Sequence, residues 1–310
     1  KINYDKCVSC GQCLVSCPFS AIADKSQIFQ LISSIKEGNK IIAAIAPAFV
    51  GQFGPLATSE KLKHALGELG FSDTYEVALG ADIGAIEEAK HYMNKVDTGE
   101  DPFLATSCCP SWSVMAKKTF PDLAPYVSSS LTPMVATARL IKKEHPDAKV
   151  VFIGPCAAKK LEAMRTSVRS DVDFVITFEE LMGIEFDAPV DENDIMDDAT
   201  AAGRGYAVAG GVADAIVNCV HQLYPDKEIK VDHAEGLRDC KKMLMLAKAG
   251  KRNGYLLEGM ACPGGCIAGA GTILPINKAA QAVKKFQDKA EEKIALQNKK
   301  LEDLENINLD

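Results

Sequence analysis

Residues 149–163, KVVFIGPCAAKKLEA, join a short apolar run to a Pro-Cys turn and a charged segment that favours helix. The run at 149–153 is rich in β-branched residues, which favour strands, and it stops at a Gly-Pro pair, which favours a turn. A strand that leads through a turn into a helix is the repeating unit of α/β proteins. The stretch therefore predicts an α/β fold, with Cys156 just after the end of a strand.

Similar apolar runs alternate with amphipathic segments along the rest of the chain. They are IIAAIAPAFV (41–50), YEVAL (75–79), FLAT (103–106), VDFVITF (172–178) and EIKVDHA (228–234). This alternation is typical of mainly parallel sheets covered by helices. The polar stretch 187–205 predicts a long loop, and apolar residues at helical spacing predict one final helix over 276–307.

Composition and charge exclude some kinds of partner. The chain has 310 residues and a net charge of -7, so it presents no basic field for nucleic acid or an anionic membrane surface, and neither partner is expected. No apolar run is long enough to cross a membrane, and the first residues, KINYDKCVSC, lack the apolar core of a secretory signal. We therefore expect a cytoplasmic protein.

The N-terminus carries a C-x2-C-x2-C-x3-C-P run. Its cysteines are Cys7, Cys10, Cys13 and Cys17. Several thiolates must converge to bind an iron-sulfur cluster, and this run is the one found in bacterial ferredoxins. Four structural thiols or a zinc knuckle are the alternatives. We predict a ferredoxin-like 4Fe-4S segment over residues 1–24 and a main domain over residues 25–310.

The fourth cysteine of this run leaves two possibilities open. In bacterial ferredoxins with two clusters, the fourth cysteine of one run serves the other cluster. Either Cys17 completes the local cluster, or a segment upstream carries a partner run. The first residue is Lys1 rather than an initiator Met, which favours a missing upstream segment.

Five more cysteines lie in three separate loops, each expected to follow a strand. They are Cys108 and Cys109 in TSCCPSW, Cys156 in GPCAAKKLEA, and Cys262 and Cys266 in EGMACPGGCIAGAG. Strand ends of a parallel sheet gather at one edge, so the three loops are predicted to meet and to supply four or five thiolates to a buried cluster. Glycines in the last loop would let the backbone approach a bulky cofactor. Cys219 and Cys240 lie in helical patterns and are predicted to be core thiols.

The three loops resemble the signatures of the FeFe-hydrogenases, which are TSCCP-x-W, P-C-x-x-K-x-x-E and M-A-C-x-x-G-C. The match extends from about residue 40 to about residue 275. The resemblance implies two lobes of mainly parallel sheet, flanked by helices, that enclose a buried H-cluster. This cofactor is a 4Fe-4S cube joined through a cysteine sulfur to a two-iron unit with CO, cyanide and an azadithiolate bridge. At least one accessory 4Fe-4S cluster accompanies it.

The resemblance also implies roles for the loop cysteines. Cys109, Cys156, Cys262 and Cys266 would hold the cube, with Cys266 bridging to the two-iron unit. Cys108 would be the thiol that faces the bridging amine.

Further residues would surround the two-iron unit. Lys159 would donate a charged hydrogen bond to a cyanide, and Glu162 would hold that lysine in place. Pro47, Ala48 and Met260 would line the cavity beside the same unit.

The implied activity is reversible oxidation of H2 and reduction of protons. Electrons would pass through the N-terminal cluster to or from ferredoxin or a similar carrier, and hydrogenase maturation proteins would supply the cofactor. Protons would pass through Cys108, Glu88 and Ser128. Many relatives carry a second glutamate three residues after the first, and this chain has His91 there.

Glu88, His91 and Lys95 form one stripe on a helix predicted to begin near Asp82. Because histidine has an ordinary pKa of about 6.5, His91 is a competent relay near neutral pH. The alternative is that the stripe is only a solvated helix face.

Three departures from the family pattern change the surroundings of the cofactor. Gly154 replaces a methionine, Ala48 replaces a serine, and GAGTI replaces a glycine-rich turn. Such groups tune rate and redox potential rather than cluster binding. These features are similar to those of a less-studied hydrogenase subgroup of anaerobic bacteria.

Two other functions are compatible with the resemblance. One is a hydrogen sensor with low turnover, and the other is a hydrogenase-like iron-sulfur assembly protein. Sensor-like relatives commonly lose the relay cysteine, and assembly proteins lose residues that hold the two-iron unit. Cys108 and Lys159 are both present here, which favours catalysis.

Overall fold

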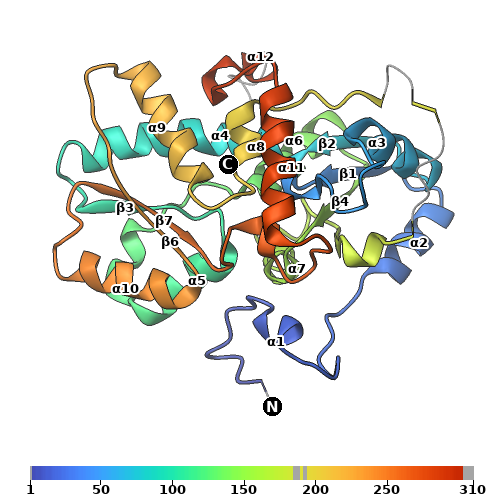
Figure 1. Cartoon of the computed structure of the whole chain (residues 1–310), viewed down its shortest axis with the longest axis horizontal. Coiled ribbons are helices and arrows are strands. Elements are labelled where there is room, and N and C mark those ends of the chain that lie inside the picture. Colours follow the sequence, from blue (N-terminus) through green and yellow to red (C-terminus); the bar gives the residue numbers. More distant parts are fainter. Residues whose placement is uncertain (1, 184–188, 191–193, 303–310) are drawn as a thin grey trace.

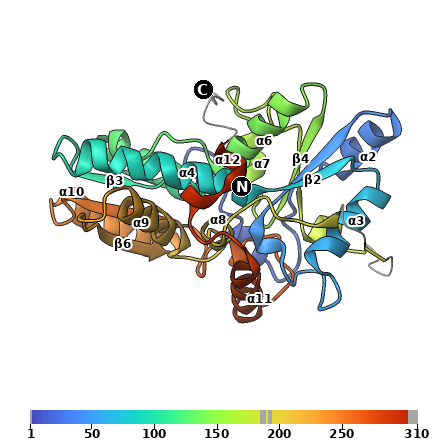
Figure 2. The same cartoon turned by 90° about the horizontal axis from the view of Figure 1, so that it is seen from above.

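A computed structural model of the chain describes residues 2–183, 189–190 and 194–302. Two parallel sheets flanked by helices form two lobes that lie side by side (Figures 1 and 2). The predicted α/β class with mainly parallel strands is confirmed.

The first lobe is built on a four-stranded sheet in the order β2-β1-β4-β5. Its strands are β2 (Asp73–Glu76), β1 (Ile41–Ile45), β4 (Lys149–Gly154) and β5 (Phe174–Thr177). All neighbours pair in parallel, and β1 is buried along its whole length. Helices α3 (Ser59–Glu68), α6 (Pro133–Glu144) and α7 (Ala157–Ala163) pack against this sheet. Burial on both faces explains the continuous apolar runs of β1 and β4.

The second lobe has a three-stranded parallel sheet in the order β3-β7-β6. Its strands are β3 (Phe103–Ala105), β7 (Tyr255–Met260) and β6 (Lys230–Glu235). Helices α5 (Pro110–Thr119), α9 (Gly211–Leu223) and α10 (Leu237–Lys248) pack on it.

A strand was expected before the loop of Cys262 and Cys266 without stated bounds, and β7 is that strand. It contains Glu258, which is buried and accepts backbone N–H groups of Gly210 (2.7 Å) and Ala213 (2.8 Å) at the start of α9. A carboxylate interrupts the apolar pattern that marks a buried strand. The two N–H groups of α9 satisfy this buried carboxylate, and they come from a distant part of the sequence.

Helix α4 (Val77–His91) packs against α6 from the first lobe and α9 from the second. It begins at Val77, so the strand predicted over 75–79 was wrong beyond Glu76, and the helix starts earlier than Asp82. The helix is buried on most sides, which explains why its apolar residues mimic the start of a strand. A π-helical turn (Tyr92–Val96) continues it.

The C-terminal segment differs from its prediction. Helix α11 (Ile276–Lys289) ends before Ala290, which is extended, and α12 (Lys299–Glu302) follows a short turn. The single helix predicted over 276–307 was therefore wrong within the described residues, and 303–307 lie outside them. Asn298, just before α12, anchors this segment to α4, because its amide donates to Asp82 Oδ2 (2.9 Å).

The loop predicted over 187–205 falls partly outside the described residues. Its last part is helix α8 (Ala201–Gly205), which begins after Thr200 because the Thr200 hydroxyl accepts from the Gly203 N–H (3.3 Å). Threonine is a favourable N-cap residue.

The N-terminal segment lies beside the two lobes rather than within either (Figure 1). It contains one short helix, α1 (Gln12–Val15), and leads to α2 (Ile28–Lys36), whose Leu31 is buried in the core of the first lobe. The N-terminal segment therefore gives way to the first lobe between α1 and α2. The predicted boundary at residue 24 stays a prediction. Within the described part of the chain, no helix is both long and apolar enough to cross a membrane.

Candidate metal centre

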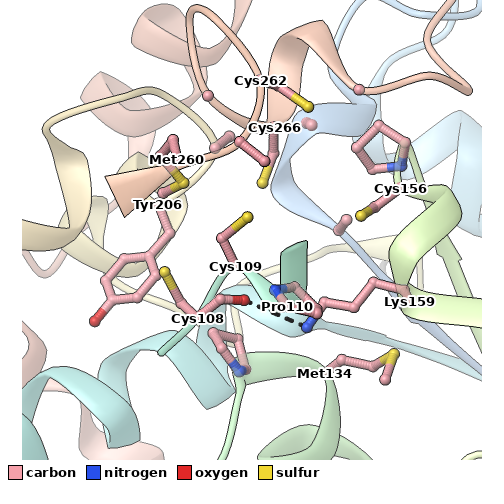
Figure 3. Close-up of a pocket in the computed structure, with 18 of the residues that line it drawn as sticks. Cys108, Cys109, Pro110, Met134, Cys156, Lys159, Tyr206, Met260, Cys262 and Cys266 are labelled. Atoms are coloured by element: carbon pink, nitrogen blue, oxygen red, sulfur yellow. Dashed lines mark hydrogen bonds between the residues drawn. The ribbon is translucent and has the colours of Figure 1, made fainter. Parts of the chain in front are cut away.

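A cavity lies where the two lobes meet. It is lined by Cys108, Cys109, Cys156, Cys262 and Cys266 (Figure 3). These cysteines follow the carboxyl ends of β3, β4 and β7, which come from both sheets. The three loops meet as the sequence predicts, although they join two sheets and not one edge.

Four of the five sulfur atoms point toward a shared space. In Figure 3 these are the sulfur atoms of Cys109, Cys156, Cys262 and Cys266, whereas the sulfur of Cys108 is turned toward Tyr206. Burial raises the pKa of Cys156 to about 11 and that of Cys262 to about 12. These thiols therefore stay protonated near neutral pH unless a bound metal displaces the protons.

The donor set fits a cluster better than a single ion. Among the described residues, no group of three or more His, Cys, Asp or Glu is arranged to hold one metal ion. The four sulfur atoms instead surround an open space, and polynuclear iron clusters require thiolates spread in this way.

Lys159 brings a positive charge to the same cavity. It lies in α7, is 8% exposed, and donates to Glu162 Oε2 (2.6 Å) and Thr132 Oγ1 (3.0 Å). Burial alone would lower the pKa of Lys159, but the Glu162 carboxylate and the neighbouring thiols raise it above its ordinary value. The lysine is therefore charged, and Glu162 holds it where an anionic ligand would meet it.

The rest of the wall is apolar. Pro47 and Ala48 contribute from the short helical turn after β1, and Met260 contributes from the end of β7. Phe152 and Met134 also line the cavity and were not predicted. Neither residue belongs to a recognisable motif, so the sequence alone does not indicate that they line the cavity.

The substitution at Gly154 is explained by Phe152. A Cβ atom at Gly154 would lie 2.5 Å from the Phe152 ring and 3.1 Å from the Ala46 Cβ. The aromatic ring thus fills the space next to a position where the resemblance places methionine.

Glycines of the last cysteine loop allow contacts within the protein. The space for a Cβ at Gly265 is taken by the backbone N of Ala209 (2.5 Å), and that at Gly269 by the carbonyl oxygen of Pro155 (2.4 Å). Both glycines bring chain segments together around the interior cavity and also line it, and the close approach of their backbone to a cofactor stays a prediction.

Glu88 and Ser128, two residues of the predicted proton path, are in contact. Glu88 is buried in α4 and accepts hydrogen bonds from the Ser128 hydroxyl and the Ser107 backbone N–H. Burial raises the pKa of Glu88 to about 7. Its charge raises the pKa of Cys108 in turn, although burial has the larger effect on that thiol.

His91 is the last residue of α4 and lies near the surface. Its side chain is 30% exposed, and its Nε2 lies 3.9 Å from Asp101 Oδ2. Lys95 lies on the π-helical turn and pairs with Glu100 at the surface. Glu88 is therefore hydrogen-bonded to Ser128, whereas His91 is partly exposed and lies near the carboxylate of Asp101.

The N-terminal cysteines form a second, more exposed group. Cys7, Cys10 and Cys17 are partly buried and Cys13 is exposed. Hydrogen bonds from the backbone N–H of Phe19 and then from that of Ala21, which lies 3.4 Å from the sulfur, lower the pKa of the Cys17 thiol.

This exposed group touches the wall of the interior cavity. Cys10 lines the cavity, and Gly11 has a positive φ of 76°. A Cβ at Gly11 would lie 2.5 Å from the Cβ of Ala270, so glycine lets the loop sit against the turn that follows Cys266. Lys118 fixes the loop from the other side, because its Nζ donates to the carbonyl oxygens of residues 4, 5 and 7 (3.0–3.4 Å).

The two remaining cysteines are core residues. Cys219 and Cys240 are fully buried within the apolar clusters of the second lobe. This confirms their prediction as core thiols.

Fold and site together define an α/β protein that gathers cysteines for iron-sulfur clusters. Residues 39–270 match the family described as iron only hydrogenase large subunit, C-terminal domain, and residues 1–23 match a 4Fe-4S binding domain. The chain belongs to the iron-only hydrogenase family.

The curated relatives fall into two kinds. The NADP-reducing hydrogenase subunit HndD of Solidesulfovibrio fructosivorans is 27% identical over 86% of this chain and 55% of its own length, so the chain spans about half of that relative. The periplasmic Fe hydrogenase large subunit of Nitratidesulfovibrio vulgaris is 29% identical over 87% of this chain and 85% of its own. Protein NAR1 of Arabidopsis thaliana is 25% identical over 89% and 74%, respectively.

Solved structures support the fold. The FeFe-hydrogenase structure HydA(deltaEFG) covers 90% of this chain and 94% of its own, with a TM-score of 0.73 and 24% identity. At this identity the likeness establishes the fold alone.

Proposed function

We propose that the protein is an FeFe-hydrogenase that catalyses reversible H2 oxidation and proton reduction in the cytoplasm of an anaerobic cell. The observation that carries the proposal is the shared cavity. Four converging thiols, the separate thiol of Cys108 and the charged Lys159 all face it. A plain 4Fe-4S site would need only the four thiols.

The proposed cofactor fits the residues present. Cys109, Cys156, Cys262 and Cys266 would hold the cube, and the adjoining apolar space would take the two-iron unit. When bound, the H-cluster supplies the centre at which H2 is split or formed. Lys159 would donate to an anionic ligand of this unit, with Glu162 keeping the ammonium in place.

Protons would leave or enter through groups of the chain itself. Cys108 would carry a proton at the cavity, and Glu88 with Ser128 would carry it through the interior. A carboxyl with a pKa of about 7 can both accept and donate a proton near neutral pH, as a relay must. His91 would hand the proton to solvent.

Electrons would take a different route. Cys10 borders the interior cavity, so a 4Fe-4S cluster on the N-terminal cysteines would lie next to the interior cube. A ferredoxin or similar carrier would exchange electrons with this exposed segment. Hydrogenase maturation proteins would deliver the two-iron unit.

Infrared spectroscopy tests the proposal directly. The protein is matured without oxygen, and absorption bands of bound CO and cyanide are sought together with H2 production from a reduced ferredoxin. Bands and turnover together are expected. Iron and acid-labile sulfide with no such bands would contradict the proposal.

A second function is favoured by the similarity to NAR1 and to the cytosolic iron-sulfur assembly component 3 of Bos taurus, at 25% and 23% identity. An assembly protein would carry iron-sulfur clusters and show neither bands nor turnover. A hydrogen sensor would show the bands with low turnover. The infrared and turnover measurements therefore separate all three functions.

A further inference from the structure

Helix α10 and the turn after it carry a concentrated positive charge. Residues 237–252 contain six Lys or Arg and one Asp, a net charge of +5. Since the whole chain has a net charge of -7, the other residues together carry -12. Residues 276–292, which include the lysine-rich helix α11, contain four Lys and three acidic residues and so lack such an excess. The net charge of the whole chain therefore hides a basic face on one helix.

The cations of α10 lie on one side of the helix. Exposed side chains recur there every three or four positions, as neighbours on one helix face do. They form a stripe, called here the basic stripe, of Arg238, Lys241, Lys242, Met245 and Lys248. The opposite side of α10 is buried in the core of the second lobe through Cys240, Met243, Leu244 and Ala247. The basic stripe is therefore free to meet a partner while the rest of the helix holds it in place.

Ion pairs within the protein neutralise the basic stripe only weakly. Lys242 pairs with Asp239 (2.6 Å) and Lys248 pairs with Asp122 (2.9 Å). All four side chains are more than half exposed, so water screens both pairs. Among the residues that the structure describes, the other two cations of the stripe form no ion pair. The positive charge of the stripe therefore remains available to an anionic partner.

Met245 gives the basic stripe an apolar centre. Its side chain is 57% exposed and lies between the lysines of the preceding turn and Lys248. Protein interfaces commonly combine an apolar centre with a polar rim, and methionine is enriched in them. Because α10 has 12 residues, it is about 18 Å long, a span that fits one small protein.

The helices beneath the basic stripe also support the N-terminal cysteine segment. Val8, which follows Cys7, packs against an apolar cluster that includes Met243 of α10 and Met115 of α5. Lys118 at the end of α5 donates to the carbonyl oxygens of residues 4, 5 and 7. Figure 1 shows α5 and α10 along the lower side of the second lobe, where the N-terminal segment also lies. A protein bound at the stripe would therefore lie beside the N-terminal cysteines.

Other anionic partners fit the basic stripe less well. A helix that binds a membrane surface inserts its apolar side, but the apolar side of α10 is buried in the protein core. Nucleic acid is bound through many phosphate contacts over an extended surface, and the acidic remainder of the chain would repel it. A small acidic protein needs only the stripe.

We propose that the basic stripe docks a small acidic electron-carrier protein beside the N-terminal cysteine segment. The inference rests on the proposed function, because it assigns the surface that meets the carrier of that function. Each docked carrier gives one electron to the protein and leaves oxidised by one electron, so two encounters supply the two electrons that reduce two protons to H2. H2 oxidation runs the same steps in reverse. Opposite charges speed the encounter, and a small contact lets the carrier leave after each electron.

The first test measures binding and no turnover, in protein that lacks the two-iron unit. Arg238→Glu/Lys241→Glu reverses two exposed charges, and acidic residues suit the first turn of a helix, so the fold should be kept. Calorimetry with an acidic bacterial ferredoxin at low ionic strength should give a dissociation constant about tenfold above that of wild type. High salt should shrink the difference, because it screens charges. Equal affinity of variant and wild type at low salt, or no binding by wild type, would overturn the proposal.

Lys278→Glu/Lys285→Glu on α11 is the matched control. Both lysines are exposed, and the net charge changes by the same amount as in the α10 variant. This control should change the affinity for ferredoxin by less than about twofold, because screening limits the reach of distant charges. Equal weakening by the two double variants would mean that ferredoxin responds only to net charge, which would overturn the proposal.

Met245→Gln separates direct contact from long-range attraction. It removes the apolar centre of the stripe and keeps the charge, so it should weaken binding about threefold at both low and high salt. Unchanged affinity would show that the carrier does not touch the stripe, which would contradict docking there.

Two further probes cover the other classes of partner. They are vesicles that contain phosphatidylserine and a DNA duplex. Wild type should bind neither. If wild type bound one of them through Arg238 and Lys241 and did not bind ferredoxin, the stripe would be a membrane or nucleic-acid surface and the proposal would fail.

Matured protein separates the docking proposal from the hydrogenase proposal. In H2 production from reduced ferredoxin, Arg238→Glu/Lys241→Glu should raise KM for ferredoxin about tenfold and change kcat little, since binding is lost and not chemistry. An unchanged KM would overturn the docking proposal while the hydrogenase proposal stood. If wild type bound ferredoxin through the stripe but showed no CO and cyanide bands, the hydrogenase proposal would fail and the docking surface would stand.

Discussion

The two cysteine groups of this protein are built in opposite ways. The N-terminal group lies within eleven residues of sequence and is partly exposed, whereas the interior group spans residues 108–266 and lines a cavity between the lobes. Local turns are enough to shape the first group. The second exists only when β3, β4 and β7 have brought three loops together, so the interior site depends on the folded body and should in turn stabilise it.

The largest expected effect contrasts one ligand from each group. Cys109→Ala and Cys13→Ala should each cost about four iron atoms, since each removes one ligand of a cube. Only Cys109→Ala should also lower the free energy of unfolding of the body, by on the order of 3–5 kcal/mol, because three loops lose their shared anchor. Iron analysis and thermal unfolding measure both. Equal destabilisation by the two variants would break the contrast.

The next prediction separates neighbours inside the interior group. Cys108 and Cys109 are adjacent, but only Cys109 points toward the shared space (Figure 3). Cys108→Ala should therefore keep its iron and its CO and cyanide bands while turnover falls about a hundredfold or more. Loss of the cluster would make Cys108 a ligand. Full activity would show that protons reach the cofactor by another path.

The next prediction concerns the effect of burial on the pKa of Glu88 and, through it, on the stability of the protein. Because burial raises its pKa from 4.5 to about 7, ionisation costs the folded state nothing below pH 4.5 and its full amount above pH 7. Glu88→Gln removes this cost, so its stability relative to wild type should rise between these pH values, by at most about 3 kcal/mol. Denaturant unfolding at several pH values measures this difference.

Lys90→Gln is the control for that experiment. Lys90 is exposed on the same helix, so its replacement should change stability little at any pH. If the difference in free energy of unfolding between Glu88→Gln and wild type does not vary with pH, the pKa of Glu88 is not raised in the folded protein.

The smallest effect is expected at the exposed end of the path. His91→Ala should slow turnover by a few-fold, because solvent can replace a partly exposed relay. His91→Glu should move the acid limb of the pH-rate profile. Lys90→Ala, on the exposed face of the same helix, is the control. Unchanged pH-rate profiles for both His91 variants would mean that His91 belongs only to a solvated helix face and carries no protons.

Much of the fold could be predicted because its strands are buried on both faces. β1 and most of β4 are apolar runs, as strands of a covered parallel sheet are. The errors lie where tertiary contacts override local pattern. α4 begins inside an apolar run that was predicted as a strand, and the predicted C-terminal helix ends at Lys289, before Asn298 binds Asp82.

The kind of ligand at both sites could be predicted from the amino-acid order alone. Cysteine spacing indicated two iron-sulfur sites, and motif order indicated the family, because thiolates and their short loops are local properties of the chain. Three features could be seen only in the folded protein. They are which sulfur atoms converge, the Phe152 ring that fills the space beside Gly154, and the Tyr206 ring that lies beside Cys108. These features depend on side chains from distant segments that meet in one cavity, and the direction of a side chain is fixed by packing rather than by its neighbours in sequence.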